Sequence, residues 1–74
     1  MSANDDLEAA ARLFEDAAEE LDRAAAHCRT AAGHMRAQEV PRGTAHAWAA
    51  LGHVDAAGER LREQARMHAG TSNP

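Results

Sequence analysis

A seven-residue repeat runs along the first half of the chain, from Leu7 to Met35. Every seventh position carries a large apolar or sulphur side chain: Leu7, Phe14, Leu21, Cys28 and Met35. Files of alanine lie three and four positions further on. A strict heptad flanked by small residues is typical of a long α-helix that packs closely against another helix, as in a coiled coil.

The repeat ends near Pro41. Proline disfavours helical backbone at the preceding Val40, and Gly43 adds backbone freedom. Thr44 is a suitable N-cap for a helix that follows. We therefore expect the chain to turn at this point.

These signals predict one all-α domain over residues 1–74. A first helix covers about 4–38, a turn covers 39–43, a second helix covers about 44–69 and a frayed tail covers 70–74. A link this short joins antiparallel neighbours. The expected fold is therefore an antiparallel two-helix hairpin.

The distribution of charge supports the same antiparallel packing of the two helices. The first helix is acidic before His27, and the end of the second helix is rich in arginine. Folding the chain back at the turn predicts ion pairs between the helices, Asp22–Arg60, Glu20–Arg62 and Asp16–Arg66.

Large apolar side chains are few for a chain of 74 residues, because alanine supplies much of its hydrophobic 45%. A core at this length rarely contributes more than roughly 3–5 kcal/mol, and oligomerisation often supplies the remainder. We expect two hairpins to pack face to face as a homodimeric four-helix bundle. The predicted interface residues are Leu7, Phe14, Leu21, Cys28, Met35, Trp48, Leu51, Val54 and Leu61.

Trp48, near the start of the second helix, has two interpretations. It could plug the turn end of the bundle against Met35 and Val40. Alternatively, it could be an exposed anchor at a partner interface, where tryptophan is enriched.

The remaining composition excludes several functional classes. A net charge of −4 disfavours a nucleic-acid or anionic-membrane binder, and no apolar run has the length of a transmembrane helix. The acidic N-terminal residues predict a cytoplasmic protein without a secretory signal. We find no glycine-rich phosphate loop and no acid pair at core positions, so we expect no cofactor and no catalysis. The expected role is a non-catalytic interaction module, such as an adaptor, accessory subunit or regulator, that binds itself and another protein.

Histidine supports an alternative, a metal- or anion-binding bundle that uses the turn half of the hairpin. His27 falls roughly opposite His53 in the antiparallel register, and zinc takes imidazole, thiolate and carboxylate ligands. The candidate metal ligands are His27, His53, Asp55 and Cys28. However, neighbouring residues point about 100° apart around a helix, so His27 and Cys28 converge poorly. The other interpretation is that the histidines border the helix seam.

A small alanine-rich hairpin with a tryptophan soon after the break resembles the WXG100 proteins of type VII secretion. The motif here reads Trp48-Ala49-Ala50, and the chain has no tyrosine for the export signal of that family. This resemblance implies a secreted hairpin that pairs with a partner, a further alternative. The segment from Glu39 to His53 also resembles short uncharacterised actinobacterial proteins, which implies a bacterial origin and no particular function.

Overall fold

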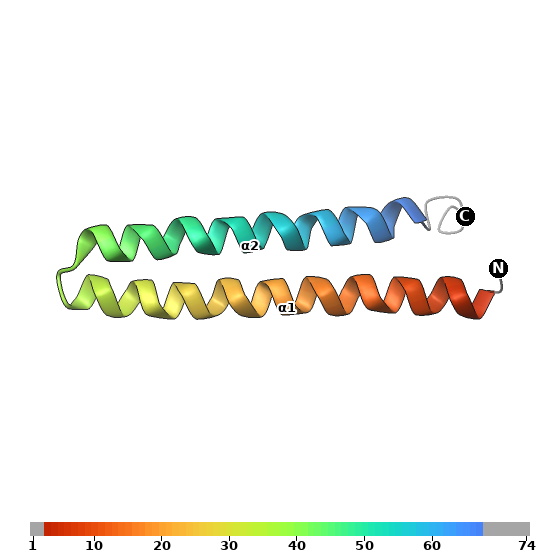
Figure 1. Ribbon diagram of the computed structural model, residues 1–74, viewed down its shortest axis with the longest axis horizontal. Helices are drawn as coiled ribbons and strands as arrows, with labels where there is room; N and C mark the ends of the chain where they lie inside the picture. The colour runs from red at the N-terminus through yellow and green to blue at the C-terminus, as the bar shows by residue number, and fades with distance from the viewer. Residues whose placement is uncertain (1–2, 68–74) are drawn as a thin grey trace.

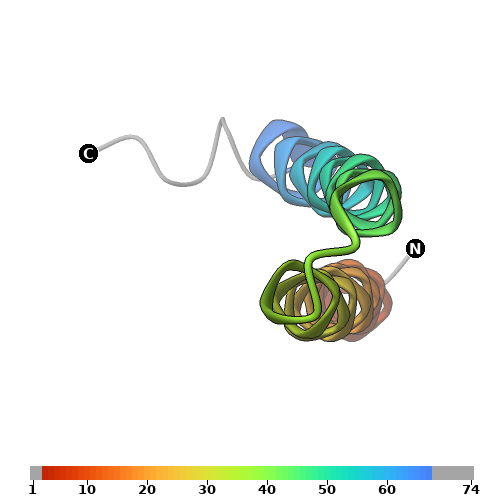
Figure 2. The same ribbon diagram turned by 90° about the vertical axis from the view of Figure 1, so that its left-hand side faces the viewer.

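The computed structural model describes residues 3–67, and two helices, α1 (Ala3–Arg36) and α2 (Val40–Met67), account for nearly all of them. The helices run antiparallel and are joined by a short connection at one end (Figure 1). The longer helix, α1, has 34 residues and is about 51 Å long at 1.5 Å per residue. Seen end on, the two helices form a single layer, and no third element of the described chain covers either flank (Figure 2). The predicted all-α antiparallel hairpin is confirmed.

The connection between the helices is a compact helix-ending motif at residues 37–39. Gln38 has a φ of 63°, in the left-handed region. Its N–H donates to the Met35 carbonyl at 3.0 Å, and the N–H of Glu39 donates to the His34 carbonyl at 2.8 Å. This pair of bonds defines a Schellman motif, which satisfies the last carbonyls of α1.

The predicted turn over 39–43 is wrong, because Pro41 and Gly43 belong to the first turn of α2. The N–H of Gly43 donates to the Glu39 carbonyl at 3.0 Å, which makes Glu39 the N-cap in place of the expected Thr44. Proline is tolerated in a first helical turn, since its missing N–H would have no partner there.

The core of the hairpin consists of small residues. Its buried positions recur every seventh residue on both helices: Ala10, Ala17 and Ala24 on α1, and Gly43, Ala50 and Ala57 on α2. A methyl group added at Gly43 would lie 2.8 Å from Met35 Cε and 3.3 Å from the carbonyl oxygen of Ala31. The two backbones therefore approach closely, and we call this line of contact the alanine seam.

None of the expected ion pairs between the helices, Asp22–Arg60, Glu20–Arg62 and Asp16–Arg66, forms within residues 3–67. Arg62 bonds to Glu59 at 2.8 Å and Arg66 bonds to Glu63 at 2.9 Å, both one turn away on α2 itself. Partners three residues apart on a helix already lie close together, so these pairs need little further ordering of either side chain. Glu20 binds elsewhere, as described below.

The end of the second helix predicted near residue 69 and the tail over 70–74 lie outside the described residues. Among residues 3–67, no helix is both long enough and apolar enough to cross a membrane.

Candidate functional site

Each helix carries a second apolar stripe beside the alanine seam. Phe14 follows the buried Ala10 by four positions, and Val54 follows the buried Ala50 by four positions. Positions with the same offset from the seam lie on the same flank of an antiparallel helix pair. The stripes of α1 and α2 therefore join into one continuous surface on the hairpin.

This surface, which we call the apolar face, is exposed along its whole length. It consists of Leu7, Phe14, Leu21, Cys28 and Met35 from α1, with Val40, Leu51, Val54 and Leu61 from α2. The exposed fractions of its larger side chains run from 42% at Leu61 to 62% at Leu7. In the observed register Leu21 lies level with Val54, and Phe14 lies level with Leu61. The predicted interface residues thus share one face, but that face lies beside the seam and not within it.

Within the single hairpin Trp48 is 70% exposed, so it does not plug the turn end of the hairpin itself. Met35 closes that end by lying over Gly43, and Val40 is itself exposed. Trp48 precedes Leu51 by three positions, which places the two side chains on the same side of α2. The tryptophan therefore stands at the outer edge of the apolar face.

Histidines from the two helices alternate along the opposite edge of the alanine seam. From the turn inwards the order is His34, His46, His27 and His53, with successive ring centroids 5.3, 5.2 and 5.4 Å apart. His27 and His53 each follow a buried alanine by three positions, which directs them away from the flank of the apolar face. All four side chains are half-buried. We call this row the histidine ladder.

A carboxylate closes each end of the histidine ladder. Glu39 Oε1 lies 3.1 Å from His34 Nδ1, and its other oxygen accepts a bond from Arg42 at 2.9 Å. Glu20 Oε2 lies 2.8 Å from His53 Nδ1. Both carboxylates can accept a hydrogen bond from the imidazole at that end.

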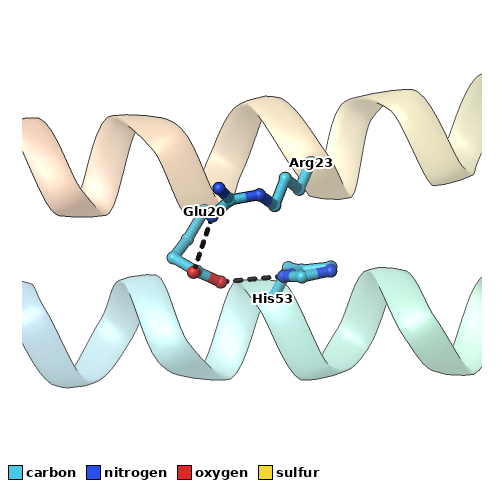
Figure 3. Close-up of polar contacts among 3 residues, drawn as sticks. All are labelled: Glu20, Arg23 and His53. Atoms are coloured by element: carbon cyan, nitrogen blue, oxygen red, sulfur yellow. Dashed lines mark hydrogen bonds and ion pairs between the residues drawn. The ribbon is translucent and has the colours of Figure 1, made fainter.

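Figure 3 shows Glu20 reaching from α1 across the seam to His53, with Arg23 beside it. Arg23 donates to the other Glu20 oxygen at 3.1 Å. The hydrogen bond from His53 is the main cause that lowers the pKa of the Glu20 carboxyl from its ordinary value. Partial burial opposes this shift, while the charges of Arg23 and Arg60 reinforce it.

The middle of the ladder is a bond between two imidazoles. His27 Nδ1 and His46 Nδ1 lie 3.0 Å apart. One nitrogen must donate and the other must accept, and a doubly protonated imidazole has no acceptor. At least one of the two rings is therefore neutral while this bond exists.

The candidate metal ligands do not assemble. His27 and His53 do stack, but Cys28 belongs to the apolar face and Asp55 is exposed. Among residues 3–67, no three His, Cys, Asp or Glu side chains gather closely enough to hold a metal ion. The expectation that the histidines border the helix seam agrees with the observed ladder.

Sequence reasoning missed the role of Glu20, which it paired with Arg62. Counting three positions on from the buried Ala17 and Ala24 gives Glu20 and His27. The same count from Gly43 and Ala50 gives His46 and His53. This spacing would have revealed the ladder once the alanine file, and not the leucine stripe, was taken as the seam.

Comparison of the chain with protein-family models, with curated proteins and with solved structures finds no match.

Proposed function

We propose that this protein is a small, non-catalytic interaction module that acts as a homodimer, in which two hairpins pack their apolar faces together as a four-helix bundle. One observation carries the proposal. The hairpin buries only alanines and a glycine in its own seam, while its larger apolar side chains, other than Leu13 and Met67, lie together on an exposed face.

The placement of that face suits a four-helix bundle. Around each helix axis the apolar face lies about 40–60° from the alanine seam, because its residues follow a buried alanine by four positions or precede one by three. The seam and the face together form one broad apolar stripe, as on a helix that contacts more than one neighbour in a bundle. The seam would serve the neighbour within the chain, and the apolar face would serve a helix of the second copy.

The energetic argument favours association over a stable isolated hairpin. A leucine or phenylalanine that is fully buried gains about 1.5–3 kcal/mol relative to the exposed side chain. Alanine gains much less, so the seam alone supplies little hydrophobic stabilisation. Covering the apolar face would add the larger contributions of Leu7, Phe14, Leu21, Val54 and Leu61.

A role in binding a further protein is supported by Trp48. It stands at the outer edge of the apolar face, where a second hairpin would leave part of the indole accessible. Tryptophan is among the residues that contribute most at protein interfaces. The homodimer would then present two such anchors to the protein on which it acts.

Light scattering after size-exclusion chromatography tests the proposal. We expect the mass of two chains at micromolar concentration, and the mass of one chain for Leu21→Glu, which places a charge in the centre of the apolar face. Ala26→Glu is the matched control, because Ala26 is exposed on the outer side of α1 and should leave the dimer intact. A monomeric wild-type protein would contradict the homodimer. That result would favour a pairing with a different hairpin, as in the WXG100 proteins.

A further inference from the structure

The charges beside the apolar face carry information about how a second copy would be oriented. One position after each stripe residue of α1 lies a charged residue, and the five form a file: Glu8, Glu15, Asp22, Arg29 and Arg36. The file is separated from the stripe by the alanines at positions 11, 18, 25 and 32. It therefore borders the apolar face on the outer side of α1 and is negative in its first half and positive in its second.

Several of these charges have no partner within the hairpin. Five of the eight arginines in the described chain bond to a glutamate of their own helix or its N-cap, but Arg29, Arg36 and Arg60 do not. Glu15 likewise makes no ion pair with any residue from 3 to 67. The border of the apolar face thus holds unpaired charges of both signs.

Two arrangements bring the apolar faces of two copies together about a two-fold axis. In the first, the turns lie at the same end, and α1 packs beside the partner's α2. In the second, the turns lie at opposite ends, and α1 packs antiparallel to the partner's α1. Hydrophobic area alone does not distinguish them, since the same face is covered in both.

We propose that the dimer takes the second arrangement, with the two-fold axis near Leu21 and the turns at opposite ends of the bundle. This inference rests on the proposed homodimer and adds its geometry. The stripe is centred on Leu21, so Phe14 would lie near the partner's Cys28 and Leu7 near the partner's Met35. The alanine file is symmetric about the same point.

Charge complementarity favours this arrangement. Glu15 would lie beside the partner's Arg29, and Glu8, which also lies 3.6 Å from Arg12 on its own helix, would lie beside the partner's Arg36. Each pair occurs twice through the symmetry. Only Asp22, which meets its own copy near the axis, is placed against a like charge. Complementary charge patterns fix orientation and register at protein interfaces.

The alternative arrangement pairs these charges poorly. With the turns at the same end, Arg29 and Arg36 would lie beside the first turns of α2, whose outer positions are Pro41 and Trp48. Glu15 would meet the partner's Arg62, which already bonds to Glu59.

Charge reversal tests the assignment through the dimer dissociation constant. Glu15→Arg should weaken the dimer by about tenfold, because each of two symmetric pairs becomes repulsive. Adding Arg29→Glu should restore the affinity, whereas adding Arg62→Glu should not. Restoration by Arg62→Glu in place of Arg29→Glu would overturn the arrangement.

A distance between the two turns gives an independent reading. A spin label at Ala37→Cys, in a Cys28→Ala background, marks the turn of each copy in a double electron–electron resonance experiment. Turns at opposite ends predict a separation of about 45 Å, from 1.5 Å per residue on either side of the axis. Turns at the same end predict about 15–20 Å, from helices that pack 8–10 Å apart. A short distance in an intact dimer would overturn the arrangement alone, whereas a protein with the mass of one chain and no dipolar coupling would overturn the homodimer as well.

Discussion

Glu20 and His53 hold the two helices of the hairpin in register through a 2.8 Å bond between Glu20 Oε2 and His53 Nδ1. The two residues are 33 positions apart in the chain and lie on opposite helices. A seam of alanines does little to stop the two helices from sliding past one another, since its side chains all have the same size and shape. A polar contact that must be matched across the seam can fix the register, as buried polar residues do in coiled coils.

The Glu20–His53 bond makes hairpin stability depend on pH in the acidic range. The folded state lowers the pKa of Glu20 below its ordinary value of 4.5, so this carboxylate stabilises the hairpin fully above that value. The contribution is lost as the pH falls through the lowered folded pKa. We expect Glu20→Gln to be less stable than wild type at pH 7, with the two melting temperatures converging as the pH falls through the lowered pKa of Glu20. Glu19→Gln, at an exposed neighbouring position, is the control and should change neither value. A difference in melting temperature between wild type and Glu20→Gln that stays the same at every pH would contradict the role of the carboxylate.

The bond between His27 and His46 predicts an energetic coupling between the two helices. A double-mutant cycle with His27→Ala and His46→Ala should give a coupling of about 1 kcal/mol, because one ring donates to the other. The same cycle for His34 and Glu39, whose side chains lie 3.1 Å apart, should also give a favourable coupling. Urea denaturation of the two sets of variants measures these energies, and a His27–His46 coupling of zero would contradict the donor–acceptor account.

Close backbone packing at Gly43 predicts a strong effect of a large side chain there. Gly43→Leu would force Met35 and the Ala31 carbonyl away, and overpacking of this kind costs about 1–3 kcal/mol. Gly52→Leu is the matched control, because a Cβ at Gly52 meets nothing within 4 Å. The control should gain up to about 1 kcal/mol from the better helix propensity of leucine. In chemical denaturation, the free energies of unfolding of the two variants should differ by about 2 kcal/mol. Equal changes in the two variants would show that the helices do not touch at Gly43.

The left-handed conformation of Gln38 predicts a stabilising substitution. At a φ of 63° a side chain is disfavoured, and glycine is the residue that most often ends a helix in this conformation. Gln38→Gly should therefore raise the free energy of unfolding by about 0.5–1 kcal/mol. Ala37→Gly, one position earlier, should lower it, because Ala37 does not adopt a positive φ. Thermal melts of the two variants in opposite directions would support the Schellman motif, and a loss of stability in Gln38→Gly would contradict it.

The fold followed from the sequence because the heptad extends without interruption from Leu7 to Met35 and a single break follows it. The exact place of the turn could not be predicted from the sequence, since Pro41 and Gly43 are as compatible with a first helical turn as with a loop. The hydrogen bonds of Gln38 and Glu39 decide between the two.

The face that each helix turns toward the other could not be read from periodicity. The leucine stripe and the alanine file both recur every seven residues and lie side by side on α1. Within one chain the alanine file forms the seam, because small residues let the backbones approach and leave room for Glu20 and the histidines. The larger side chains of the stripe make it the more obvious candidate for the inner face. The histidine ladder is visible in the sequence only when the alanine file is the seam. The sequence therefore predicts one part of it, the approach of His27 to His53.

The central claim is that the apolar face is covered by a second copy of the chain. It is tested most directly by the dependence of thermal unfolding on protein concentration. If folding and dimerisation are coupled, the melting temperature must rise with concentration, since a dimer that dissociates on unfolding is stabilised by mass action. We expect a steady rise in the melting temperature of the wild-type protein between 5 and 500 μM (about a hundredfold range), and no such rise for Leu21→Glu. A wild-type melting temperature that stays constant across this range, with the mass of a single chain, would contradict the account.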